Sequence, residues 1–162
     1  SAESRRLVAT GHVVSRLQPR GKAEAKTPPA PVEARAGEMV YEAALREIVY
    51  TGEVTIRQGD IKTRSPKATL RLSEDGRDLL SVVAGEPAEI EQGKRRATGA
   101  RETYTPATET VVIVGDKVVL QDPGQQVEGR TLTFHVGDDK ILVDGQEQVR
   151  TEAVIRREPP RP

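Results

Sequence analysis

The feature that most constrains the fold is a strand pattern that recurs along the chain around a glycine. The stretch VYTGEVTIRQGD, residues 49–60, is typical of one β-strand that ends in a turn, and VIVGDKVVLQDPG, residues 112–124, has the same form. Five glycines stand in similar contexts: Gly11, Gly52, Gly85, Gly115 and Gly145. From the second of these onward the steps are 33, 30 and 30 residues, so the sequence predicts stacked repeats.

Two irregularities are compatible with this repeat. The first step is 41 residues long because a Pro-, Ala- and Lys-rich loop insertion, residues 19–31, lies within it. Val54 and Ile56 stand two and four residues after their glycine, whereas Val118 and Leu120 stand three and five residues after theirs. A β-bulge would reconcile the two spacings.

Each unit is predicted to form two short strands joined by turns. Apolar and polar residues alternate along 54–56, 68–72 and 132–134. The breaks carry typical turn dipeptides: Asp75-Gly76, Pro123-Gly124, Gly137-Asp138 and Asp144-Gly145. Because a strand pair cannot bury its apolar face alone, the stacked units are expected to form a thin, continuous apolar seam. The predicted fold class is all-β: a folded-over stack of short antiparallel strands, open on one side.

The segment 33–48 has two interpretations. Its sequence, EARAGEMVYEAALREI, consists of good helix formers, and Val40, Ala44 and Ile48 would share one helical face. The repeat aligns it instead with the Thr-rich stretch 97–110, which is a poor helix former, and Tyr41 and Tyr104 each stand eleven residues before a repeat glycine. Strand–turn–strand is favoured, because tertiary context often overrides local propensity.

Composition narrows the functional classes. The 162 residues carry a net charge of zero, so no global field attracts nucleic acid or an anionic membrane surface. Three Tyr and one Phe are the only aromatic residues, which leaves little material for base-stacking platforms. The absence of cysteine removes disulfides, thiolate chemistry and Cys-based metal sites. No apolar run has the length of a membrane span, and the first residues lack a signal-peptide core, which leaves export undecided.

Catalysis has little support in the sequence. His12 and His135 fall in different repeats, and the alternation around Phe134 places His135 outward on its strand. The acidic pairs at 74–75 and 138–139 stand in turns, where Asp is favoured by its side-chain bonds to the backbone. No nucleotide-binding, zinc-protease or calcium-loop motif occurs. We therefore predict a protein that is not an enzyme, with no catalytic residue, cofactor or metal site.

Two strand patterns alternate along most of the chain. An apolar-x-G-x-V strand, often followed by Q-G, alternates with an A-x-x-[LMA]-x-[YFL] strand, in the segments 36–41, 50–59, 68–72, 100–104, 114–121 and 127–134. This arrangement resembles the OstA-like family, which includes the periplasmic lipopolysaccharide-transport protein LptA. The resemblance extends over about residues 32–155 and rests on the sum of the repeats rather than on one diagnostic motif.

The resemblance implies a β-taco or β-jellyroll of V-shaped strands, with an apolar groove that carries the acyl chains of lipid A. It implies a periplasmic protein, peripheral to membranes, whose partners are lipopolysaccharide and LptA-, LptC- or LptD-like domains joined by edge-strand addition, or further copies joined end to end. No nucleic-acid partner is expected. Within one predicted domain we distinguish a partial first repeat with the insertion at 1–31, the repeat domain at 32–157 and a Pro-rich tail at 158–162.

Two alternatives are open at this stage. One is the N-terminal OstA-like domain of an outer-membrane lipopolysaccharide assembly protein, or of a larger repeat protein, which the start of the chain within a repeat favours. The other is a purely structural β-solenoid scaffold with a closed core and no lipid groove.

Alternation assigns a set of apolar residues to the inner face, where the resemblance places the lipid groove: Val54, Ile56, Ile61, Leu70, Leu72, Val83, Ile90, Val118, Leu120, Val127, Leu132, Phe134, Ile141 and Val143. Alternation does not decide which of them would face a lipid and which only pack. The basic run Lys94, Arg95 and Arg96 is a candidate contact for a headgroup phosphate, with a solvated loop as the alternative. Strands at 7–17 and 148–155 are predicted edges for pairing with other chains.

Overall fold

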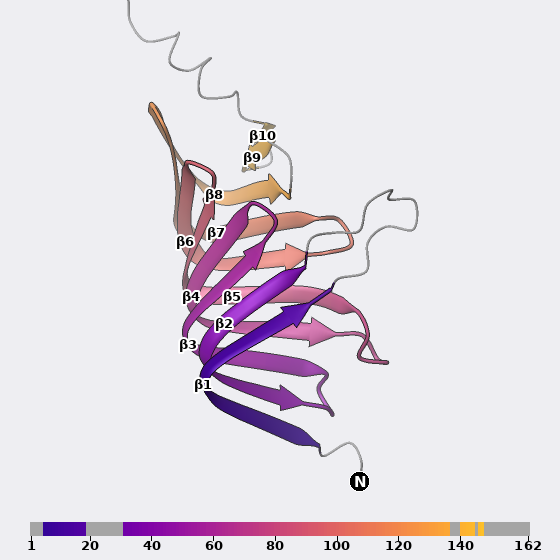
Figure 1. Ribbon diagram of the computed structural model, residues 1–162. Coiled ribbons are helices and arrows are strands. Elements are labelled where there is room, and N and C mark those ends of the chain that lie inside the picture. The colour runs from indigo at the N-terminus through magenta and orange to yellow at the C-terminus, as the bar shows by residue number, and fades with distance from the viewer. Residues whose placement is uncertain (1–4, 19–30, 137–139, 145, 148–162) are drawn as a thin grey trace, which may run out of the picture.

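The computed structural model describes residues 5–18, 31–136, 140–144 and 146–147 of the chain. Within these ranges the regular structure consists of ten strands and no helix: β1 (Arg6–Leu17), β2 (Val32–Glu42), β3 (Glu47–Gln58), β4 (Ile61–Leu72), β5 (Leu79–Gln92), β6 (Arg95–Thr105), β7 (Thr110–Asp122), β8 (Gln125–His135), β9 (Ile141–Val143) and β10 (Gln146–Glu147). Each strand pairs antiparallel with the next, in one sheet whose order is that of the chain (Figure 1). The predicted all-β fold class is confirmed.

The sheet folds over along a crease that crosses β1 to β8. Every strand pair from β1–β2 to β7–β8 shifts register near its middle, for example between Thr51 and Val54 of β3. Each strand therefore bends there and continues into a second layer, which gives the V-shaped ribbons of Figure 1. Arm A denotes residues 6–10, 38–42, 47–51, 67–72, 79–85, 101–105, 110–114, 130–135 and 141–143. Arm B denotes residues 13–17, 32–36, 54–58, 61–65, 88–92, 95–99, 118–122 and 125–129.

The glycines of the sequence repeat lie on this crease. Gly11, Gly52, Gly85 and Gly115 occupy or border the register shifts of β1, β3, β5 and β7, so every second strand bends at a repeat glycine. The predicted glycine ladder is confirmed at these four positions, and Gly145 lies outside the described residues. Because the strands bend at the same level, the single sheet forms two facing layers, arm A and arm B.

Strand pairing also decides two local predictions, the conformation of residues 33–48 and the bulge that reconciles two glycine spacings. Residues 43–46 form a turn between β2 and β3, so 33–48 is strand–turn–strand as favoured. Its helix-forming residues are held extended because β2 pairs with β1 on one side and with β3 on the other. The bulge of β7 contains one residue more than the bulge of β3, which accounts for the different spacing of Val54 and Val118 from their glycines.

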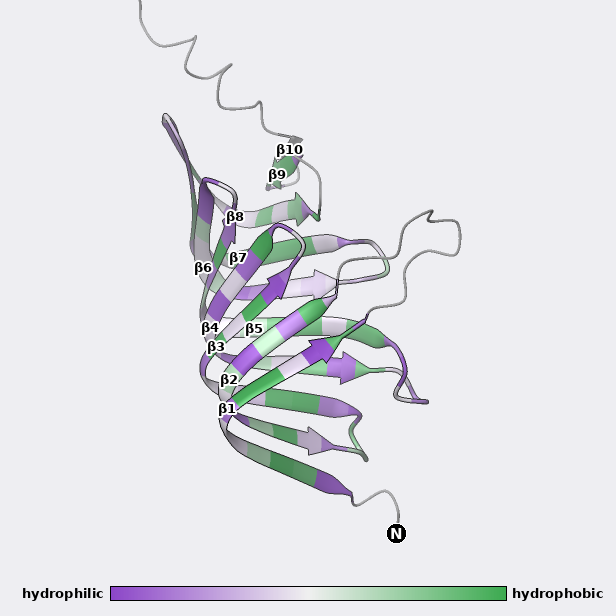
Figure 2. Ribbon diagram, viewed as in Figure 1, coloured by the Kyte–Doolittle hydropathy of each residue, from purple (hydrophilic) through white to green (hydrophobic). Residues whose placement is uncertain are grey.

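The core lies between the two arms. Buried residues alternate with more exposed ones along each arm, and the strands in Figure 2 carry the corresponding hydrophobic and hydrophilic bands. Cross-strand partners place the inward residues in continuous rows. One row of arm A contains Leu7, Tyr41, Ile48, Leu70, Val82, Tyr104, Val111, Phe134 and Ile141. A row of arm B contains Ser15, Ala34, Ile56, Thr63, Ile90, Ala97, Leu120 and Val127.

Several predicted features fall outside the described residues. These are residues 19–30 of the insertion predicted at 19–31, the edge strand at 148–155 and the Pro-rich tail at 158–162. The boundaries 1–31, 32–157 and 158–162 therefore stay predictions, although β1 and β2 belong to the same sheet.

The crease can be tested at Gly52. This glycine has φ +85°, and a Cβ there would lie 3.3 Å from the backbone of Gly37 on the neighbouring strand. Replacing Gly52 with Ala therefore combines left-handed backbone strain with a backbone contact, and we expect a loss of about 2–3 kcal/mol in unfolding free energy. Urea unfolding followed by circular dichroism measures this loss.

The matched control is Gly93→Ala in the β5–β6 turn. Gly93 has φ +60°, and a Cβ added there would meet open space, so this variant reports the backbone cost alone, about 1 kcal/mol. Equal losses in the two variants would mean that the close approach at the crease contributes nothing.

Candidate functional site

The candidate site is the lumen, by which we mean the space between the inner faces of arm A and arm B. The structure brings nearly all of the predicted groove residues to this lumen and buries them: Val54, Ile56, Ile61, Leu70, Leu72, Ile90, Val118, Leu120, Leu132, Phe134, Ile141 and Val143. Val127 belongs to the same inner rows and is half-buried. Since these side chains fill the space between the arms, the lumen of the described residues is packed rather than empty.

Val83 is the exception. It pairs with Thr69 and Thr103 on the outer face, while its neighbours Val82 and Ala84 point inward and are buried. Because Val82 and Val83 are adjacent and both apolar, alternation does not indicate which of them points inward. An irregularity in the β4–β5 pairing beside Leu72 decides this. A pairing irregularity of this kind is invisible in a single strand sequence.

Sequence reasoning missed several lumen residues. Tyr50, Val82, Tyr104, Val111 and Ile113 are buried on the inner face. One signal for Tyr104 was available, because Tyr41 and Tyr104 share their distance to a repeat glycine and also share one cross-strand row. The repeat therefore indicated the shared row of these two tyrosines, which alternation alone did not.

The lumen is less tightly covered at the β1 end. Val13, Leu17, Met39, Tyr41 and Ile48 pack against the core but stay partly exposed. Leu7, the first member of its row, is 57% exposed. The apolar seam thus reaches the surface at β1, on which no further strand pairs within the described residues.

A polar cluster interrupts the apolar lumen near its middle. Thr63 of arm B donates a hydrogen bond to Oε2 of Glu102 in arm A at 3.4 Å, and Nε2 of Gln58 donates to the Tyr104 hydroxyl at 2.5 Å. Glu102 is 3% exposed, and its Oε1 has no hydrogen-bond partner within the described residues. A cavity of about 10 Å³ lies among these four residues and their apolar neighbours. Both hydrogen bonds cross the lumen and join the two arms.

Burial controls the ionisation of this cluster. Loss of hydration raises the pKa of Glu102 to about 8, against a smaller lowering by the Thr63 hydrogen bond. Burial also raises the pKa of Tyr104, with Gln58 opposing and Glu109 reinforcing that shift. Both groups are therefore mostly neutral at pH 7, which suits an otherwise apolar space.

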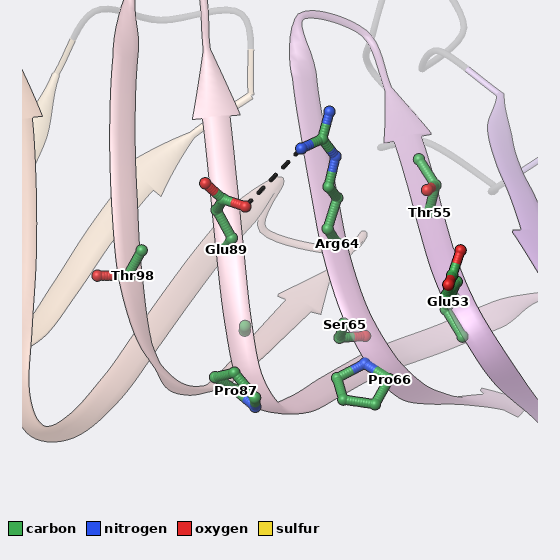
Figure 3. Close-up of a pocket in the computed structure, with 10 residues that line it drawn as sticks. Glu53, Thr55, Arg64, Ser65, Pro66, Pro87, Glu89 and Thr98 are labelled. Carbon is green, nitrogen blue, oxygen red and sulfur yellow. Dashed lines mark ion pairs between the residues drawn. The ribbon is translucent and has the colours of Figure 1, made fainter.

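A second hollow lies on the outer side of arm B beside the crease (Figure 3). Its volume is about 770 Å³, and it is lined by Glu53, Val54, Thr55, Arg64, Ser65, Pro66, Pro87, Ala88, Glu89 and Thr98. Arg64 and Glu89 form an ion pair with 3.9 Å between the charged atoms, and Glu89 also lies 3.2 Å from Arg96. Arg64 and Glu89 of this hollow are thus engaged in cross-strand pairs.

The basic run lies around the β5–β6 turn at the tip of arm B. Arg96 pairs with Glu89 and Glu91, and Arg95 lies 3.4 Å from Asp122 in a largely buried ion pair. Lys94 is exposed in the turn. An open hollow of about 460 Å³ lies beside the three cations, with Glu91 and Asp122 also in its lining.

The histidines are not brought into one site. His12 is exposed near the crease on β1, and His135 ends β8 and is half-buried. The described residues contain no cluster of His, Asp or Glu suited to a metal ion. Nor does any helix in the described part of the chain have the length and apolarity to cross a membrane.

Comparison with known proteins gives two matches of different kinds. A family model described as "LptA/(LptD N-terminal domain) LPS transport protein" matches residues 31–140. The fold is similar to the crystal structure of LptH, the LptA-homologous periplasmic component of the lipopolysaccharide transport device from Pseudomonas aeruginosa. That match has a TM-score of 0.60 and 21% sequence identity, and covers 70% of this chain and 82% of LptH. No curated protein sequence matches the chain.

The buried carboxyl predicts a pH dependence of stability. Glu102 titrates near 4.5 in an unfolded chain and near 8 when folded, so between these values the folded state binds more protons. The contribution of protonated Glu102 to stability is therefore fully present below about pH 4.5 and is lost as the pH rises through 8. We expect the unfolding free energy to fall by a few kcal/mol over this window in urea titrations.

The control is E102Q, which keeps the shape of the side chain and cannot ionise. The unfolding free energy of E102Q should therefore lack the fall with pH that Glu102 causes. All other titrating groups are the same in the two proteins. Identical pH profiles for the two proteins would show that Glu102 does not ionise in that window.

Proposed function

Because the chain belongs to the family of LptA and the LptD N-terminal domain, we propose that it is a non-catalytic carrier that holds the acyl chains of lipid A in its lumen. It would act in the periplasm, as one element of a protein bridge for lipopolysaccharide. An external motor would drive movement along the bridge, and this chain would supply the path rather than any chemistry.

The observation that carries the proposal is the run of inward, largely apolar rows from β1 to β9. Both walls of the lumen come from the same strands, and the walls are joined by backbone along the crease. Each CH₂ group of an acyl chain that enters such a space gains about 0.8 kcal/mol relative to water. A chain that inserts several such groups is held by several kcal/mol without a specific polar contact.

Entry of a lipid requires the arms to separate, because the inner side chains are packed. The arm tips opposite the crease are the natural place for this movement, since the arms are covalently continuous only at the crease. Gln58–Tyr104 and Thr63–Glu102 are the cross-lumen hydrogen bonds that such an opening breaks. We assign loading to the β1 end, where Leu7, Met39 and Tyr41 are less covered.

A second assignment is the N-terminal domain of an outer-membrane lipopolysaccharide assembly protein, because the matching family includes the LptD N-terminal domain. The same lumen would serve in that setting. A purely structural scaffold is the alternative that a lipid-capture experiment decides.

Strand addition at β1 is the proposed link to neighbouring domains. β1 pairs with β2 on one side, no other strand of the described residues pairs on its second side, and it exposes Val8 (49%) and Val14 (54%). LptA-, LptC- or LptD-like domains, or another copy of this chain, are the proposed partners, since an unpaired strand edge accepts an extended segment.

For a headgroup phosphate, the geometry favours Lys94 over the other two cations of the basic run. Arg95 and Arg96 already pair with carboxylates, so an incoming phosphate would compete with those partners. Lys94 is exposed at the turn and is the residue that we propose as the headgroup contact.

Lipid capture can be tested by photo-crosslinking from neighbouring residues of β2. Tyr41 faces the lumen and Val40 faces outward, so a benzophenone amino acid at each position samples opposite sides of one strand. We expect lipopolysaccharide adducts, detected by immunoblot, from position 41 and few or none from position 40. Equal labelling of both positions, or none from a folded protein, would count against the lumen as the carrier site.

Edge pairing can be tested with charges on β1. Substituting Val8 and Val14 with Lys places like charges on the strand that a partner would cover, and we expect concentration-dependent association to be lost in light-scattering measurements. Leu80→Lys on the central strand β5, where the leucine is 48% exposed, is the matched control. Association that survives on the β1 variant, or that the control removes equally, would place the contact elsewhere.

A further inference from the structure

The two hydrogen bonds that join the arms do not by themselves account for a carboxyl group in the lumen. Glu102 stands in a cross-strand row whose nearest other members are Ala68, Ala84, Ile113 and Leu132, all buried. A carboxyl group at such a place costs free energy, because it loses its hydration and finds one side-chain partner instead of several. An apolar residue of similar size would pack in the same row without that cost.

We propose that Glu102, Thr63, Gln58 and Tyr104 form a subsite that recognises a hydroxyl group carried by an acyl chain. This inference rests on the proposed function, since it takes the lumen to be the place where acyl chains lie. The ligand class is a hydroxylated fatty acyl chain, as distinct from a plain saturated one.

The geometry matches one small polar group. Oε1 of Glu102 is buried and has no partner within the described residues, and the adjoining cavity of about 10 Å³ has the size of one water-sized group. The cavity lining combines the four polar residues with apolar neighbours that include Ile56, Ile61 and Val111. A hydroxyl on a hydrocarbon chain has this combination of properties, with a polar atom flanked on both sides by CH₂ groups.

The hydrogen-bonding capacity also fits. A protonated carboxyl can donate one hydrogen bond and accept others, as can the Thr63 hydroxyl. Burial favours the protonated form of Glu102 at neutral pH, so an uncharged ligand group is preferred to an anion. A hydroxyl satisfies Oε1, whereas an unsubstituted chain at this level leaves buried polar groups unpaired.

The cluster also connects recognition with the state of the arms. Thr63 and Gln58 belong to arm B, and Glu102 and Tyr104 belong to arm A. When an acyl chain separates the arms, these hydrogen bonds break and four polar side chains lose their partners across the lumen. A hydroxyl at this level restores such a bond, so it offsets part of the cost of opening.

The test compares the intact chain's binding of a saturated long-chain fatty acid with that of hydroxylated acids of equal length, bearing the hydroxyl near the head group or at mid-chain. Displacement of a fluorescent fatty acid gives the dissociation constants. We expect at least one hydroxylated acid to bind about tenfold more tightly than the plain acid. E102L should lose this preference while still binding the plain acid, and E102Q, which keeps a donor and an acceptor, should retain part of it.

A second variant guards against a folding defect in E102L. Thr63→Val removes a hydroxyl from the opposite arm with little change of shape, and it should weaken the preference without abolishing capture of the plain acid. Equal binding of all acids by the wild type, or a preference that E102L and Thr63→Val both leave intact, overturns the subsite while leaving the carrier function in place. Failure of the folded wild type to bind any of the acids overturns both.

Discussion

The structure depends on one constraint, which is that a ribbon with a single apolar face must cover that face. This chain meets the constraint by bending every strand at the same level, so that each strand supplies both walls of the core. Gly52 and Gly85 lie at these bends, where the backbone of one strand closely approaches that of the next. A narrow seam built mainly from Val, Ile, Leu and Ala, with Tyr50, Tyr104 and Phe134 as its buried aromatic members, then suffices.

Much of this arrangement could be predicted from the sequence. The glycine spacing predicted the stack and its bends, and alternation correctly placed residues such as Leu70 and Ile90 on the inner face. These predictions succeeded because each repeat unit carries the same glycine position and the same apolar–polar alternation, so that neighbouring strands place equivalent residues side by side. The match of residues 31–140 to the LptA and LptD N-terminal family agrees with the resemblance seen in the strand patterns.

The remaining features depend on contacts between strands that are far apart in the sequence. Val83 faces outward because of an irregularity in pairing with β4, and nothing in its own strand signals that shift. Glu102 stands in a charged and Thr-rich segment that suggests an exposed strand, yet its row is buried between the arms. Arg95 and Arg96 acquire carboxylate partners from β5 and β7, which changes the chemistry expected of an isolated basic run.

The construction of both walls from the same strands has a consequence for assembly. A segment that pairs along the full length of β1, and bends as β1 does, lengthens both walls in a single step. Under the proposed strand addition, the apolar seam of one molecule would then continue into the next without any additional docking surface to align them. In such an assembly, the continuity of the apolar seam would follow directly from backbone pairing.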